Sequence, residues 1–298
     1  MGAIKLEDLP KMQTMLDEHL DGLKFSKIER LGGLTNHTYH VTLTTGRELV
    51  LRIPGEGTED MIDRADEQKC AELASKLSID SNCIYFGTDG SKITEYIPDA
   101  ETMNADKLKE ESYMEEMADI YKRLHHCGVD TGVKFDVFDM AKTYEKIIIE
   151  HKVPMFKDYD EVKNTVIKLK KEIDTLCDTT PVPCHNDPLC ENWVHGSDRM
   201  YLIDWEYGGM NDGMWDVADI SIEAGYDKKL DDKFLRLYLG KEPDTLTWKH
   251  FYANKIYVDY LWTLWAMTRV PFDGKPMADW AEERYTRLKG NIEAINNL

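Results

Sequence analysis

The sequence predicts an α+β protein with two lobes: a small N-terminal lobe built on an antiparallel sheet, and a larger, mainly helical C-terminal lobe. Apolar and polar residues alternate in several segments before residue 98, whereas apolar residues recur at helical spacing from residue 105 onward. Strands and helices that are segregated along a chain are typical of α+β proteins, and 298 residues suffice for two domains. We therefore expect an N-terminal lobe over residues 1–98 and a C-terminal lobe over residues 99–298.

The composition excludes several classes of protein. Hydrophobic residues make up 42% of the chain and charged residues 31%, which is typical of a soluble globular protein and argues against a disordered or membrane-spanning one. The formal net charge of -19 would repel nucleic acids and anionic membrane surfaces, so neither is expected as a partner. A nucleotide could still be bound locally by a few basic side chains, backbone amides and a metal ion. The first ten residues lack the apolar core of a secretory signal, so we expect a cytoplasmic protein.

The N-terminal lobe is expected to contain five strands, with a helix inserted between the third and the fourth. An amphipathic helix over 6–20 comes first, and the alternating stretch 24–53 then predicts three antiparallel strands. After a loop, apolar residues between Met61 and Leu77 recur at helical spacing. Two further strands are predicted at either side of Asp89-Gly90, a dipeptide that favours a tight hairpin turn.

The C-terminal lobe is expected to consist mainly of long helices. The predicted segments are 114–126, 144–151, 162–176 and 251–267. The chain has no internal repeat and no low-complexity linker, so we expect the two lobes to share a ligand-binding cleft.

The strongest functional signal is HNDPLCEN at residues 185–192, which fits the kinase catalytic-loop pattern H-x-D-x-x-x-x-N. In this chemistry Asp187 orients a hydroxyl group or accepts its proton, while Asn192 and Asp204 offer hard oxygen ligands to Mg²⁺. Segments 193–195 and 200–203 flank a turn and predict a short hairpin that returns Asp204 to Asn192. Asn and Asp are also ordinary turn residues, and an inactive kinase would keep the same pattern.

With these motifs the sequence resembles the choline/ethanolamine kinase family, within the kinase-like group that includes aminoglycoside phosphotransferases. The resemblance spans nearly the whole chain and rests on residues 185–192, on LIDWEY at 202–207 and on YLWTLW at 260–265, which is similar to the family's paired-tryptophan segment. It is closest to bacterial choline kinases. The resemblance implies a two-lobed, protein-kinase-like fold that uses ATP and Mg²⁺ to phosphorylate the hydroxyl group of choline.

An aromatic cage for the choline head group is suggested by Trp262 and Trp265. Their spacing places both indole rings on one face of a predicted helix, where they could flank a cation, although core packing explains the same spacing. The resemblance implies that they bind the trimethylammonium group, and that Tyr207 and Trp280 complete the cage.

An acidic residue, Glu223, is placed by the resemblance near the ammonium group, where its charge would attract the substrate. A solvated acid on a helix surface is the alternative. The family has an aromatic residue shortly afterwards, but here Lys228 takes that place and Tyr226 stands two positions earlier, so one cage wall is in doubt.

For the nucleotide, the resemblance implies a phosphate-covering loop over residues 31–38 that includes Gly33, Thr35 and Asn36. The loop matches neither G-x-G-x-x-G nor the P-loop pattern, so without the resemblance it is only a turn.

The resemblance also places Arg52 against the α- and β-phosphates, with Glu67 as the partner that orients it. A surface ion pair of little energetic value is the alternative for these two residues. Tyr96 and Ile97 match the family's hinge, whose backbone groups would bind adenine.

Two other functions stay open at this point. One is a kinase for ethanolamine or another small amino-alcohol or aminoglycoside, and the other is an inactive choline- or nucleotide-binding protein of the same fold. The sequence indicates no oligomeric state.

Overall fold

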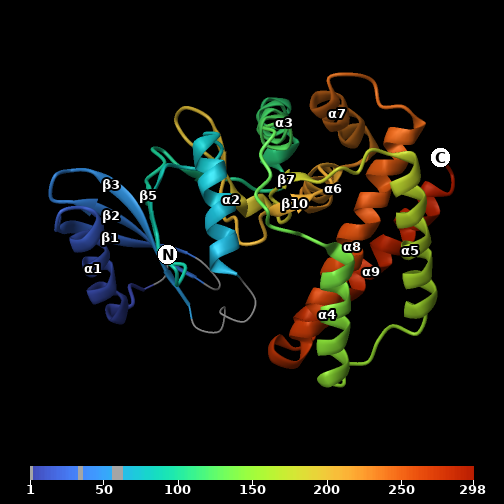
Figure 1. Cartoon of the computed structure of the whole chain (residues 1–298), viewed down its shortest axis with the longest axis horizontal. Coiled ribbons are helices and arrows are strands. Elements are labelled where there is room, and N and C mark those ends of the chain that lie inside the picture. Colours follow the sequence, from blue (N-terminus) through green and yellow to red (C-terminus); the bar gives the residue numbers. More distant parts are fainter. Residues whose placement is uncertain (1–2, 33–35, 56–62) are drawn as a thin grey trace. The chain divides into compact units, whose positions relative to one another are not determined.

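The computed structural model describes residues 3–32, 36–55 and 63–298, and the chain forms two compact units. The first unit comprises Met1–Met103 and Glu191–Gly208, and the second comprises Asn104–Cys190 and Gly209–Leu298. The antiparallel sheet lies in the first unit and the long helices lie mainly in the second (Figure 1), which confirms the predicted fold class. The expected division of function between residues 1–98 and 99–298 stays a prediction. No helix in the described part of the chain is long and apolar enough to cross a membrane.

Five antiparallel strands form the sheet of the first unit, in the order β1-β2-β3-β5-β4. The strands are β1 (Phe25–Gly32), β2 (Asn36–Leu43), β3 (Glu48–Pro54), β4 (Cys83–Phe86) and β5 (Lys92–Glu95). The five predicted strands are thus confirmed. Gly90, in the turn between β4 and β5, has a φ of +87°, a conformation in which glycine avoids the clash of a Cβ atom.

Alternation along the strands creates the core of this unit. On β2 the buried side chains include Tyr39, Val41 and Leu43, and they pack with Met12 and Leu16 of α1 (Leu9–His19). Helix α1 follows a 3₁₀ turn, η1 (Leu6–Asp8), and its apolar side chains cover the sheet. Helix α2 (Arg64–Lys76) occupies the predicted insertion between β3 and β4.

A second, smaller sheet in the first unit has the order β6-β8-β9. Its strands are β6 (Glu101–Thr102), β8 (Trp193–His195) and β9 (Met200–Leu202). The hairpin predicted over residues 193–203 is therefore present, and its strands pair from Trp193–Leu202 to His195–Met200.

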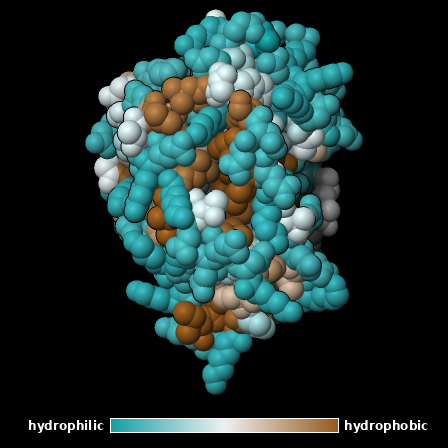
Figure 2. All heavy atoms as spheres, turned by 90° about the vertical axis from the view of Figure 1, so that its right-hand side faces the viewer, coloured by the Kyte–Doolittle hydropathy of each residue, from teal (hydrophilic) through white to brown (hydrophobic). Residues whose placement is uncertain are grey.

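Long helices dominate the second unit, and α8 (Thr245–Asp273) is its central element, since α4, α5, α6 and α9 all contact it (Figure 1). The other helices of this unit are η2 (Lys107–Lys109), α3 (Glu111–His125), α4 (Val137–Glu150), α5 (Tyr159–Leu176), α6 (Met214–Glu223), α7 (Lys228–Leu239) and α9 (Lys275–Ile295). Helices α3, α4, α5 and α8 overlap the four predicted helical segments. Figure 2 shows a face on which hydrophilic residues predominate and surround smaller patches of hydrophobic ones, as the charged composition leads one to expect.

Candidate active site

The predicted catalytic loop begins in the second unit, where two short strands and helix α6 hold it. Strand β7 (Val182–Cys184) leads into the loop and pairs antiparallel with β10 (Gly209–Asn211), which leads into α6. Asp216, in the first turn of α6, is fully buried and accepts hydrogen bonds from the backbone N–H groups of His185 and Asn186, both at 2.8 Å. His125 of α3 lies 3.1 Å from the same carboxylate. Asp216 thus braces the backbone of the loop.

Asn186 gives the loop its shape. It has a φ of +69°, a left-handed conformation that Asn tolerates better than most residues. Its side chain accepts a hydrogen bond from Asn211 at 2.9 Å, and its carbonyl accepts one from the indole N–H of Trp215 at 3.0 Å. These contacts present the next residue, Asp187, as a half-buried carboxylate.

The hairpin β8–β9 brings Asn192 and Asp204 to the same end of its two strands. Asn192 ends the 3₁₀ turn η3 (Cys190–Asn192) just before β8, and its carbonyl accepts a hydrogen bond from the N–H of Ile203 at 2.9 Å. Asp204 follows Ile203 directly, so the two predicted metal ligands flank the open end of the hairpin.

Asp204 lies in an electrostatically crowded place. Its φ of +67° is unusual for a residue other than glycine, and such strained residues cluster at functional sites. Although 44% of its side-chain surface is exposed, desolvation by the surrounding protein and then the negative charge of Glu206 raise the pKa of the Asp204 carboxyl to about 6. A bound cation would favour the ionised carboxylate.

Three carboxylates in the first unit form a cluster of hard oxygen donors. Glu67, Asp204 and Glu206 each offer an oxygen, and these oxygens lie within 4.8 Å of one another. Close by, the amide of the buried Asn36 donates a hydrogen bond to Glu206 at 2.9 Å, and its own Oδ1 accepts none from the residues that the structure describes. Carboxylate and amide oxygens are the ligands that Mg²⁺ prefers, so this donor set fits such an ion.

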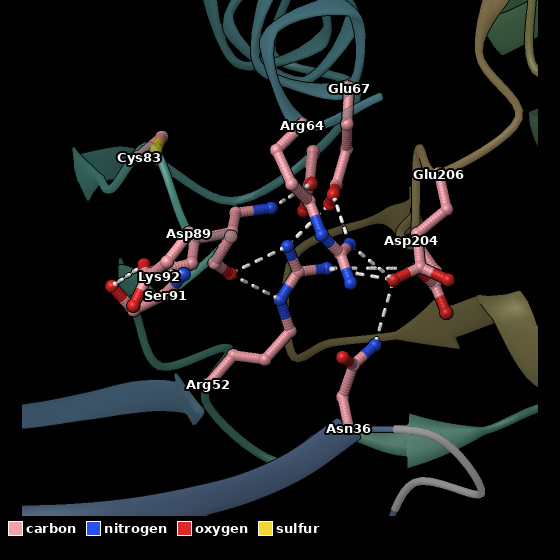
Figure 3. Close-up of polar contacts among 12 residues, drawn as sticks. Asn36, Arg52, Arg64, Glu67, Cys83, Asp89, Ser91, Lys92, Asp204 and Glu206 are labelled. Atoms are coloured by element: carbon pink, nitrogen blue, oxygen red, sulfur yellow. Dashed lines mark hydrogen bonds and ion pairs between the residues drawn. The ribbon is translucent and has the colours of Figure 1, made fainter. Parts of the chain in front are cut away.

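Arg52 and Glu67 form the predicted ion pair (Figure 3). The Nη2 of Arg52 lies 2.5 Å from Oε1 of Glu67, and both side chains are buried, so the alternative of a surface pair is wrong. Arg52 also donates two hydrogen bonds to the carbonyl of Gly90, at 2.9 and 3.2 Å. The guanidinium group is therefore held in one orientation.

Sequence reasoning missed Arg64 and gave Glu206 no role. Arg64 lies at the start of α2, and its guanidinium group is 2.6 Å from Glu67 and 2.8 Å from Glu206 (Figure 3). The i,i+3 spacing of Arg64 and Glu67 on one helix was a local signal for the Arg64–Glu67 pair, whereas no local signal indicates the contact with Glu206. Two arginines and three acids thus share one network in the first unit.

The hinge residues have different surroundings. The ring of Tyr96 stacks on His40 with ring centroids 3.8 Å apart. The backbone N–H of Tyr96 donates a hydrogen bond to the carbonyl of Glu48. Ile97 is buried and packs with Val194 and Tyr201. The Tyr96 N–H is therefore already hydrogen-bonded within the protein, and a backbone hydrogen bond to adenine would have to come from another group of the hinge. Gly33 and Thr35, predicted in the phosphate loop, lie outside the described residues.

The three predicted cage tryptophans lie together in the second unit. Trp262 and Trp265 of α8 make an edge-to-face contact with centroids 6.3 Å apart, and Trp265 makes a similar contact of 5.9 Å with Trp280 of α9. The guanidinium carbon of Arg284 lies 4.1 Å from the centroid of Trp280 and covers one face of that ring.

Of the remaining cage residues, Glu223 is not a solvated surface acid, because it forms an ion pair with the buried Arg284. Tyr226 is a core residue whose hydroxyl donates to the carbonyl of Leu108, so it does not replace the aromatic residue missing at Lys228. Tyr207 belongs to the first compact unit, and its place in the cage stays a prediction.

A cavity of about 830 Å³ in the second unit does not coincide with these residues. Its lining includes Phe138 of α4, Ile173 of α5 and Tyr257 of α8, and it includes neither Asp187 nor the three cage tryptophans. The cavity is therefore not part of the candidate active site.

Known proteins match most of the chain. The family model described as choline/ethanolamine kinase matches residues 28–260. Protein LicA of Haemophilus influenzae is 28% identical over 274 residues, which cover 89% of this chain and 79% of the relative. The solved structure of the choline kinase LicA from Streptococcus pneumoniae has a TM-score of 0.77 and 29% identity, and the match covers 95% of this chain and 99% of that one. A LicA structure in complex with AMP has the same TM-score and identity, with 96% and 98% covered.

Proposed function

Because the chain belongs to the choline/ethanolamine kinase family, we propose that it is a choline kinase, which transfers the γ-phosphoryl group of ATP to the hydroxyl group of choline to give phosphocholine and ADP. The observation that carries this proposal is the presence, in one chain, of a braced catalytic Asp187 and a cluster of three tryptophans suited to a quaternary ammonium group. The similarity to proteins named LicA, one of them a choline kinase, supports choline as the acceptor. The use of ATP supports a cytoplasmic location.

Positioning supplies most of the catalysis in phosphoryl transfer. Asp187 would accept a hydrogen bond from the choline hydroxyl and orient its oxygen for in-line attack. The hydrogen bonds from His185 and Asn186 to Asp216 fix the backbone that carries Asp187. The loop therefore holds its carboxylate in place before the substrate binds.

Mg²⁺ is the proposed cofactor. Asn192 and Asp204 would hold it, and the neighbouring oxygens of Glu206 and Asn36 are suited to bind either the ion or its water ligands. When bound, the ion neutralises charge on the phosphates.

Arg52 would bind the phosphate oxygens, as an arginine can do through two parallel hydrogen bonds. Glu67 and the Gly90 carbonyl hold its guanidinium group in place. Adenine would bind along the hinge that includes Tyr96 and Ile97, and the LicA structure with AMP supports a nucleotide site in a relative of this fold.

The acceptor is tested by measuring ADP release with choline, with ethanolamine and with no acceptor. We expect turnover with choline well above the other two reactions, because indole faces stabilise a trimethylammonium group that cannot donate hydrogen bonds. Trp262→Ala should raise the KM for choline roughly tenfold or more, since a desolvated cation–π contact contributes about 2 kcal/mol. Trp248→Ala, near the start of the same helix, is the control and should leave this KM near the wild-type value. Turnover with ethanolamine alone would refute the choline assignment and keep the phosphotransferase.

A second prediction concerns Glu67. Glu67→Gln should raise the KM for ATP roughly tenfold or more, because it removes the charge that orients Arg52 and that also pairs with Arg64. Glu72→Gln is the matched control: Glu72 lies on the same helix, is 44% exposed at its side chain and pairs only loosely with Lys76 at 3.8 Å. Equal ATP kinetics in the two variants would show that Glu67 does not position Arg52.

A further inference from the structure

Asp219 is a buried acid that sequence reasoning did not single out and that lies against the tryptophan cluster. It is 1% exposed, and its Oδ2 lies 3.4 Å from Nε1 of Trp262, which donates a hydrogen bond to it. On α6 it stands three residues after the loop brace Asp216 and four before Glu223, so all three carboxylates project from one side of the helix.

The charges behind the cluster do not balance. Arg284 pairs with both Glu223 and Asp259, and Arg287 forms two hydrogen bonds with Asp259, at 2.6 and 3.0 Å. Three carboxylates, including Asp219, thus face two guanidinium groups. Asp219 is the acid to which neither arginine lies within ion-pair distance among the described contacts; its hydrogen bond comes from the neutral indole. Among the residues that the structure describes, Asp219 thus has no cationic partner within ion-pair distance in this buried group, and a bound cation would stabilise its ionised form.

We propose that Asp219 is a specificity-determining residue, whose charge selects a cationic acceptor and whose hydrogen bond orients the indole of Trp262 against it. This inference rests on the proposed function, because it assigns the acceptor's cationic head group to the tryptophan cluster. The role is additional to that of Glu223, whose charge is already paired with Arg284.

Two further observations support this role. Burial and then the charge of Glu223 raise the pKa of Asp219 well above its usual value, and Arg284 opposes that rise only in part, so the carboxyl favours its neutral form until a cation is bound beside it. Asp187 is also close enough to add to the rise, so the catalytic carboxylate and Asp219 belong to one electrostatic neighbourhood in the second unit. A cationic group bound there would stabilise both carboxylates in their charged form.

The test separates charge from shape. Choline and its neutral isostere 3,3-dimethylbutan-1-ol differ in whether nitrogen or carbon carries the three methyl groups, so the ratio of their kcat/KM values measures the contribution of charge. Asp219→Asn keeps a hydrogen-bond acceptor for Trp262 and removes the charge, and we expect it to reduce this ratio about tenfold or more, mainly through the KM for choline. A similar loss for both acceptors would mean that Asp219 only supports the fold of the cage, and would overturn the proposal.

Two further variants complete the design. Trp262→Phe keeps an aromatic face and the charge of Asp219 but lacks the indole N–H, so it should weaken both acceptors while keeping most of their ratio. Asp231→Asn is the matched control: Asp231 is buried and ion-paired with Lys255 at 2.7 Å, and we expect the wild-type ratio. Loss of the ratio in Asp231→Asn as well would show a general effect of buried charge and would count against Asp219.

Calorimetric titration of the full-length protein with tetramethylammonium distinguishes this proposal from the proposed function. In one outcome the wild type binds this cation, Asp219→Asn binds it at least tenfold more weakly, and neither protein phosphorylates choline. The charge-selecting role then stands and the kinase assignment falls. If the wild type phosphorylates choline and Asp219→Asn binds the cation equally well, the kinase assignment stands and the role of Asp219 falls. If Asp219→Asn does not fold, Asp219→Ser is titrated instead, with the same expected loss.

Discussion

Replacing Asp187 by asparagine is expected to lower kcat for choline phosphorylation by about 10²–10⁴-fold, the range that a positioned proton acceptor contributes. The side chain keeps its size and its braced backbone, so the change removes only the charge that orients the attacking hydroxyl group. Nucleotide affinity should stay within about twofold of the wild type, because phosphate binding is assigned to Arg52 and the metal ligands. Steady-state ADP release and calorimetric titration with ATP and Mg²⁺ measure the two quantities.

Asp178→Asn is the control for this variant. Asp178 lies nine residues earlier, just before β7, and is exposed, so its replacement should change neither quantity. If Asp187→Asn kept more than a tenth of the wild-type kcat, Asp187 would not be the residue that orients the hydroxyl group.

Asp216→Ala is expected to lower the free energy of unfolding by about 3–5 kcal/mol, as the loss of one partner from a buried charged network does. The change leaves the N–H groups of His185 and Asn186 buried without their acceptor and removes the partner of His125. Because the same backbone carries Asp187, kcat should fall as well under conditions in which the variant is still folded. Urea unfolding of the full-length protein, followed by circular dichroism, measures the stability.

Asp227→Ala is a matched control for this second variant. Asp227 also accepts hydrogen bonds from two backbone N–H groups, those of Lys229 and Leu230 at 2.9 Å, but it is exposed at the start of α7. Water can solvate the freed groups there, so we expect a loss of about 1 kcal/mol. Equal losses in the two variants would show that burial does not set the importance of Asp216.

Much of the fold was predictable because it depends on local patterns. Alternation in the segment 24–53 corresponds to β1–β3, and the Asp89-Gly90 step corresponds to the turn between β4 and β5. The hairpin between Asn192 and Asp204 was predictable for the same reason, since two short apolar segments on either side of a turn are close in sequence and favour antiparallel pairing. The motif and the hairpin together predicted that Asn192 and Asp204 lie at the same end of one hairpin, as the structure shows.

The partners of the charged side chains could not be predicted in this way. The resemblance places Glu223 near the substrate's ammonium group, which stays a prediction; its ion pair with Arg284, 61 residues away in sequence, was not foreseen. Likewise, Arg64 reaches Glu206 across 142 residues, and Asp219 meets Trp262 across 43.

Local sequence was thus enough to predict the α+β architecture, the catalytic loop and the aromatic segment of this protein. The folded chain was needed to show which acids are paired with arginines and that Asp219 instead accepts a hydrogen bond from the indole of Trp262. The physical reason is that strand and helix periodicity depends on neighbours a few residues apart, whereas the energy of a buried charge depends on every group that the fold brings within a few ångströms of it.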